Sequence, residues 1–283
     1  MRGDLFHPQL SGNKWFKLKY NLLAAEHQQV PAILSFGGVW SNHIYSLAAA
    51  GNALQLPTIG VIRGRWHKNL TPTLADAVDW GMKLVFVDKH EYRQRHSPQW
   101  VSQCLPDWWH QCFGASPKLD AARQTIAVGE QHGGNNDSAL PPWQRLKIIP
   151  EGGGNTAGMK GVKEWAKSIY AAFSNPTTFV IPVGSGGTLA GFASVPSQHQ
   201  LIGVPVLKAG NSIRQTIQEL LYSAPSDATH TGWQLAHGYE WGGYGRYPQA
   251  LKIFVAATEE ATGIPLDPVY NAKAAYAFFD LLQ

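Results

Sequence analysis

The chain has 283 residues, of which 44% are hydrophobic and 15% charged, so it has the composition of a soluble globular protein and the length for two modest domains. Its 23 Lys and Arg residues against 19 Asp and Glu residues give a formal net charge of +4, an excess too small to indicate a nucleic-acid-binding protein. No apolar run approaches the length that crosses a bilayer, and the N-terminus lacks the apolar core of a signal peptide. We therefore expect a cytoplasmic protein with neither nucleic acid nor a membrane as a partner.

The spacing of cysteine and histidine argues against a disulfide scaffold and against a metal centre. The spacing of the two cysteines, Cys104 and Cys112, allows a bond, but a cytoplasmic protein is not expected to form one. The 11 histidines are scattered, and no HExxH or CxxC pattern occurs. We expect no metal ligands.

Short β-branched runs alternate with helical segments from one end of the chain to the other. A helix is predicted from about Asn42 to Leu54, and Thr71-Pro72 is an N-cap signal for another that ends near Gly81. Strands are predicted at Ala32–Phe36, Thr58–Ile62, Lys83–Val87, Lys147–Ile149, Thr177–Val183 and Leu201–Val204. This alternation predicts an α/β fold with mostly parallel sheets, flanked by helices on both faces. A polar stretch from Gly133 to Trp143 marks the boundary between two lobes.

The first segment that carries chemistry is SGNKWFKLKY, which places Lys14 at the very start of a predicted helix. Leu18, Leu22 and Ala25 fall at helical spacing behind it. A helix N-terminus disfavours a protonated amine, and partial burial lowers the amine pKa further, so a lysine here can become a nucleophile. Taken alone, the segment also fits an ordinary solvated lysine.

The second segment is SFGGVWSNH, in which a buried strand runs into Gly37 and Gly38 and then into a helix that begins with Ser41 and Asn42. The glycines allow a flat group to approach the backbone closely, and the two polar side chains can hold a carboxylate and a phenolate oxygen at the helix N-terminus. An ordinary glycine turn followed by an N-cap fits the same residues.

The third segment is VGSGGTLAG, directly after the apolar strand that ends at Val183. Its glycines expose consecutive backbone N–H groups, and the following helix directs its positive end to the same point. Because strand, loop and helix occur in this order, we favour a phosphate-binding loop over a simple turn. The fourth segment, GIPLDPVYNAK, has prolines before a last helix and brings Tyr270 to the start of that helix, where it can donate a proton or orient a substrate, or is simply packed.

The four segments in this order resemble the fold-type II pyridoxal-phosphate (PLP) enzymes, specifically the 1-aminocyclopropane-1-carboxylate (ACC) deaminase/D-cysteine desulfhydrase family. A further motif, PEGGGNxxGxxG at Pro150–Gly161, adds to the resemblance, which covers nearly the whole chain. It implies two domains with the cofactor in the cleft between them. Residues 1–17 and 146–283 would form the large PLP-binding domain, and residues 18–145 the small one. The family also implies a homodimer that acts on a small amino acid.

The resemblance also implies roles for individual residues. Lys14 would hold PLP as a Schiff base and move the α-proton, Asn42 would bind the ring oxygen of PLP, and Ser41 would contact the substrate carboxylate or assist proton transfer. Tyr244 and Tyr270 match active-site tyrosines of the family. The phosphate would be bound by the loop residues Gly184, Ser185, Gly186, Gly187 and Thr188.

Two residues depart from the ACC deaminase pattern. Asn271, which would face the pyridine nitrogen, stands where ACC deaminases carry Glu, and a neutral amide holds a proton on that nitrogen less firmly than a carboxylate. His43 follows Ser41-Asn42, as in the desulfhydrase branch, where ACC deaminases usually carry Gln. Both favour β-elimination from a small D-amino acid over ring opening.

Three hypotheses follow. The leading one is a D-cysteine desulfhydrase, which converts D-cysteine to pyruvate, ammonia and sulfide, and the second is an ACC deaminase, which forms 2-oxobutyrate and ammonia. Because family members extend beyond Met1 and beyond Gln283, where the family has a further strand, the third is a truncated, non-catalytic PLP-binding protein.

Overall fold

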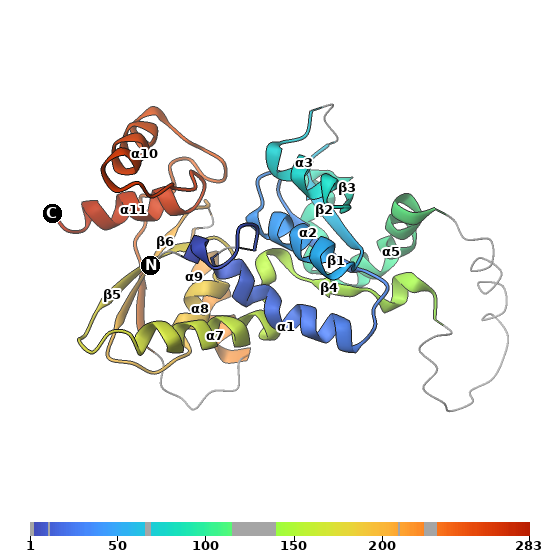
Figure 1. Ribbon diagram of the computed structural model, residues 1–283, viewed down its shortest axis with the longest axis horizontal. Coiled ribbons are helices and arrows are strands. Elements are labelled where there is room, and N and C mark those ends of the chain that lie inside the picture. Colours follow the sequence, from blue (N-terminus) through green and yellow to red (C-terminus); the bar gives the residue numbers. More distant parts are fainter. Residues whose placement is uncertain (1–2, 11, 66–68, 115–139, 209, 224–230) are drawn as a thin grey trace. The chain divides into compact units, whose positions relative to one another are not determined.

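The computed structural model describes residues 3–10, 12–65, 69–114, 140–208, 210–223 and 231–283, which form two compact α/β units (Figure 1). The N-terminal unit comprises Arg2–Ser11 and Leu22–Glu151, and the C-terminal unit comprises Gly12–Asn21 and Gly152–Gln283. Helix α1 (Asn13–His27) contributes to both units, since the division falls after Asn21. Residues 133–139 of the predicted boundary between lobes lie outside the described residues.

The sheet of the N-terminal unit has four parallel strands in the order β3-β2-β1-β4. The strands are β1 (Ile33–Gly37), β2 (Thr58–Arg63), β3 (Lys83–Val87) and β4 (Lys147–Ile149). Helices α2 (Asn42–Leu54) and α3 (Pro72–Asp79) cover one face, and α4 (Lys89–Arg93) and α5 (Pro98–Phe113) cover the other. Successive side chains of β1 point to opposite faces of the sheet, so that Leu34 and Phe36 pack against α5 while Ser35 faces α2. The predicted strands and the helix from Asn42 are confirmed.

The sheet of the C-terminal unit has three parallel strands in the order β5-β6-β7. They are β5 (Thr178–Val183), β6 (Gln200–Pro205) and β7 (Gly232–Leu235), of which β7 was not predicted. Helices α7 (Thr156–Tyr170), α8 (Gly187–Ala193) and α9 (Ser212–Ser223) form a core with one face. Helix α11 (Asn271–Asp280) packs on the other face, next to α10 (Gln249–Thr262). The predicted fold, parallel sheets with helices on both faces, is therefore confirmed in both units.

Short 3-10 helices complete the described elements, at η1 (Gly3–Leu5), η2 (Gln94–His96), η4 (Pro142–Arg145) and η5 (Glu151–Gly153). Cys104 and Cys112 both lie on α5 as free thiols. Within the described ranges, no helix is both long and apolar enough to cross a membrane.

Candidate active site

Lys14 is the second residue of α1, as the sequence predicts, and it belongs to the C-terminal unit. Burial lowers the pKa of the Lys14 amine to about 8, and the nearby carboxylate of Asp267 opposes this shift only in part. A substantial fraction of the amine is therefore neutral at mildly alkaline pH. A neutral amine is the form that attacks a carbonyl carbon.

A second lysine, which the sequence analysis did not single out, lies one helical turn further along α1. Lys17 is 2% exposed, and its Nζ donates a hydrogen bond to the carbonyl oxygen of Gly152 at 3.0 Å. Burial first, and then the like charge of Lys14, hold the Lys17 pKa well below its usual value. A Cβ atom added to Gly187 would stand 3.3 Å from Nζ, so the Lys17 amine lies directly at the glycine loop. The three-residue spacing from Lys14 was the signal available in the sequence.

The glycine loop Gly184–Thr188 joins the end of β5 to the start of α8. Asn13 on α1 donates from Nδ2 to Oγ1 of Thr188 at 2.7 Å, which fixes α1 against the loop. A second glycine run, Gly152–Gly154, packs against this loop, since a Cβ on Gly152 would stand 2.7 Å from Oγ of Ser185. Gly187 approaches this run as well, since its added Cβ would stand 3.7 Å from Cα of Gly154, so glycine on both sides lets the two runs pack closely.

These groups fit a phosphate. A bound phosphate would favour the protonated form of Lys17 in spite of its burial, and Lys17 would then supply a cation where the start of α8 presents backbone N–H groups. In its protonated form Lys17 has three N–H donors, of which one binds the carbonyl oxygen of Gly152, so donors remain for an anion. The donor set therefore matches the phosphate group of PLP.

Tyr270 lies next to the glycine loop, because a Cβ on Gly184 would stand 3.0 Å from its ring carbon Cε1. Asp267 holds the segment that leads into α11, because its Oδ1 accepts hydrogen bonds from the backbone N–H groups of Val269 at 2.8 Å and Tyr270 at 2.6 Å. Tyr270 is half-buried and Asn271, the first residue of α11, is exposed. Lys14, the glycine loop and Tyr270 are thus gathered in one unit.

Tyr244 is half-buried in the same unit, within the glycine-rich turn that follows β7. Gly242, Gly243 and Gly245 have φ values of +88°, +105° and +69°, a region that side chains rarely adopt. The turn places Tyr244 between two residues whose conformation requires glycine.

Ser41 and Asn42 belong to the N-terminal unit and begin α2, as predicted. Ser41 is 7% exposed, and its Oγ accepts the N–H of Ile44 at 3.3 Å as an N-cap. A Cβ on Gly37 would come within 2.4 Å of the Ile44 side chain, so this glycine is required by packing. Asn42 is half-buried at the first position of the helix.

His43 faces the core of the N-terminal unit. Its Nε2 lies 2.9 Å from Oγ of Ser35, which in turn donates to the carbonyl oxygen of Ile149 at 2.7 Å. The contact joins α2 to β1 and β4, so His43 has a structural role that the sequence analysis did not identify.

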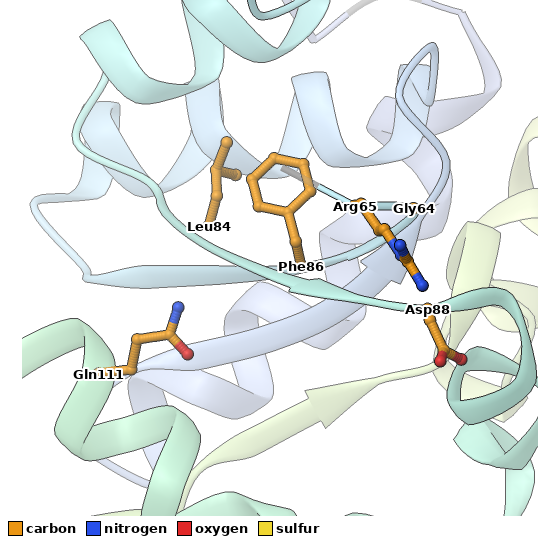
Figure 2. A pocket seen from close by; sticks show the side chains of 6 residues that line it. All are labelled: Gly64, Arg65, Leu84, Phe86, Asp88 and Gln111. Atoms are coloured by element: carbon orange, nitrogen blue, oxygen red, sulfur yellow. The ribbon is translucent and has the colours of Figure 1, made fainter. Parts of the chain in front are cut away.

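A separate hollow of about 430 Å³ lies at the β3 edge of the N-terminal sheet and contains none of the predicted site residues. Figure 2 shows Leu84 and Phe86 projecting from β3, with Arg65 and Asp88 at one end and Gln111 reaching from α5. It combines an apolar floor with one cation and one carboxylate.

Known proteins resemble the chain over its full length, although no family model matches it. It is 25% identical over 292 residues to a mitochondrial bifunctional D-cysteine desulfhydrase/ACC deaminase of Arabidopsis thaliana, covering 99% of this chain and 66% of that protein. It is 26% identical over 298 residues to a D-cysteine desulfhydrase of Yersinia enterocolitica, covering all of this chain and 80% of that one.

A solved structure has the same fold. The crystal structure of an ACC deaminase homologue matches with a TM-score of 0.74 at 22% identity, covering 99% of this chain and 78% of that one. The chain is therefore a distant relative of the D-cysteine desulfhydrases and ACC deaminases, and it has the fold that the four motifs indicate.

Proposed function

We propose that the chain is a PLP-dependent lyase of a small amino acid, with D-cysteine as its substrate. The observation that carries the proposal is the pair Lys14 and Lys17 on one turn of α1, both with lowered pKa values, of which Lys17 lies beside the glycine loop at the start of α8. A reactive amine and a phosphate site side by side are what covalent binding of PLP requires. The names of the relatives agree with this chemistry.

Each residue would have one task. Lys14 would bind the aldehyde carbon of PLP through Nζ and, once displaced by the substrate amine, take the proton from the substrate Cα. Lys17 would neutralise the phosphate, together with the backbone of the loop Gly184–Thr188. PLP, when bound, supplies the electron sink that makes the Cα proton removable.

The remaining residues would act on the ring and on the substrate. Ser41 would bind the substrate carboxylate or assist proton transfer, and Asn42 would bind the phenolate oxygen of the ring. Tyr244 and Tyr270 would line the substrate-binding site. The reaction is balanced as D-cysteine plus water giving pyruvate, ammonia and hydrogen sulfide. The Cα–H and Cβ–S bonds break, sulfur leaves with the bonding pair, and water replaces nitrogen at Cα.

Asn271 distinguishes the two candidate substrates. A neutral amide in place of a carboxylate stabilises a protonated pyridine nitrogen less, which weakens the electron sink. Ring opening of ACC needs that sink more than loss of a thiolate does, so we place D-cysteine first and ACC second. The relatives' names include both activities and favour neither.

The deciding experiment is an absorbance spectrum of the purified protein with added PLP, beside Lys14→Ala. A band from PLP joined to Lys14 is expected in the native protein and not in the variant. Assays of pyruvate and sulfide from D-cysteine, and of 2-oxobutyrate from ACC, then follow. Turnover of ACC alone would reverse our choice of substrate, and a band without turnover of either would support the non-catalytic PLP-binding protein.

Three further features are proposed: a homodimer and the two-domain division at residues 17 and 145, both from the resemblance, and a cytoplasmic location, from the sequence. Light scattering of the PLP-loaded protein tests the first, and a monomer at micromolar concentration would contradict it.

A further inference from the structure

Lys273 is a fully buried lysine on α11, two residues after Asn271, and none of the roles above uses it. Its Nζ donates to three backbone carbonyl oxygens, those of Gly243 at 2.8 Å, Glu240 at 3.0 Å and Val206 at 3.1 Å. An ammonium has three N–H donors and no acceptor, so three carbonyl oxygens match its charged form. Burial lowers its pKa, and the carboxylates of Glu240 and Asp267 oppose that shift.

Two of the three carbonyls bracket the turn that leads to Tyr244. Between them Trp241 has a φ of +50°, in the left-handed region that residues other than glycine rarely adopt. The N–H of Gly243 donates to the carbonyl oxygen of Glu240 at 2.8 Å and closes the turn. The conformation is intrinsically unfavourable, so outside contacts must hold it.

The third carbonyl, of Val206, follows the end of β6, and α11 packs on the same sheet. Lys273 therefore joins three pieces of the C-terminal unit: the carboxyl end of the central strand β6 at Val206, the turn from Glu240 to Gly243, and the helix that begins after Tyr270. The turn and the helix carry Tyr244 and Tyr270, the two tyrosines proposed above to line the substrate.

We infer that Lys273 is a positioning residue that holds the turn Glu240–Gly243, and through it Tyr244, in the arrangement that turnover requires. The inference rests on the proposed function for the role of Tyr244, while the clamp itself stands on the three hydrogen bonds. In this role Lys273 acts through the turn, by its three hydrogen bonds to backbone carbonyl oxygens, and not by contact with the cofactor or the substrate. Its loss is therefore expected to impair turnover and to spare PLP capture at Lys14.

Hydrogen exchange on the native protein without PLP tests the clamp independently of activity. We expect the Gly243 amide to be protected to the degree of the amides in α11. In Lys273→Met, which keeps the bulk and removes the donors, exchange at residues 240–244 should rise at least tenfold while exchange in α7 is unchanged. The matched control is Lys167→Met, at an exposed lysine of α7. An unprotected Gly243 amide in the native protein would overturn the clamp even if Lys273→Met fails to fold.

Kinetics of the PLP-loaded protein test the effect on turnover. We expect Lys273→Met to lower kcat with D-cysteine by roughly 100-fold, the loss that a misplacement of about 1 Å produces, while the absorbance of PLP at Lys14 is kept. Because the effect passes through Tyr244, the double variant with Tyr244→Phe should lose no more than the worse single variant. Additive losses would overturn the positioning role. If the native protein turns over neither substrate, the proposed function fails, and the exchange experiment still decides the clamp.

Discussion

Lys14 and Lys17 show how one turn of helix separates two kinds of lysine. Both have lowered pKa values because both are buried, and Lys17 in addition donates to the backbone carbonyl oxygen of Gly152 and lies against the glycine loop. Lys14 retains a pKa near 8 because Asp267 offsets part of the cost of burial. Lys14 is therefore suited to reversible bond formation, and Lys17 to holding an anion.

The pKa of Lys14 predicts its reactivity as a function of pH. Competitive acetylation of the cofactor-free protein, read by mass spectrometry, should give half-maximal reactivity of Lys14 near pH 8. An unperturbed lysine reaches that point only near pH 10.5. Since the folded-state pKa is the lower one, the unfolded chain binds more protons between pH 8 and 10.5, and the Lys14 contribution to the free energy of unfolding rises across that window. A midpoint above pH 10 would contradict the burial of the amine.

Replacing Lys17 should weaken phosphate binding specifically. In Lys17→Met the affinity for PLP is expected to fall by roughly 10- to 100-fold, the value of a charge-assisted hydrogen bond. The affinity for pyridoxal, which has no phosphate, should change little. Titration of both compounds against the native protein and the variant measures the difference, and an equal loss for both would show that Lys17 acts on the fold instead.

At the scale of elements, the close packing of helix α7 against helix α1 positions the two lysines of the candidate site. Helix α7 passes α1 so closely that a Cβ on Gly161 would stand 1.9 Å from the carbonyl oxygen of Phe16, between Lys14 and Lys17. A side chain there would push α7 away from α1, the helix that carries both lysines. This close contact explains why the last position of the PEGGGNxxGxxG motif, Gly161, is a glycine.

Gly161→Ala tests this packing. The variant is expected to lose more than 2 kcal/mol of stability, as overpacking against backbone does, and to bind PLP more weakly. The control is Gly232→Ala in β7, where an added Cβ meets nothing within 4 Å. Chemical denaturation and PLP titration measure both effects; similar values for the two variants would contradict the close contact.

At the scale of the whole molecule, cofactor binding should be linked to stability. A ligand that binds only the folded state stabilises it by about 2.7 kcal/mol at 100 times its dissociation constant. For a chain of this size we expect PLP to raise the melting temperature by about 5 °C or more. In Lys14→Ala, which cannot bind PLP covalently, the increase should be much smaller, and an unchanged increase would contradict covalent capture at Lys14.

Local rules predicted the regular parts of the fold and failed where tertiary contacts override them. Proline usually ends a helix, because it lacks the backbone N–H donor, yet helix α5 continues through Pro106. The helix is held there because Val101, Leu105 and Trp108 are all buried against the same face of the sheet. Strand β7 was missed because its exposure alternates without an apolar run, and pairing with β6 defines it. Lys17 and Lys273 were missed as well, since a lysine shows its burial only when its neighbours are known.

The sequence by itself determined the alternation of strands and helices, the position of Lys14 at the start of α1, and the glycine loop between β5 and α8, because periodicity, caps and glycines act over a few residues. Only the tertiary structure decided which groups meet. Lys17 at Gly187, Tyr270 at Gly184 and Lys273 at three carbonyls join segments far apart in the chain. Their pKa shifts and hydrogen bonds arise from burial, which is a property of the packed chain and not of any local pattern.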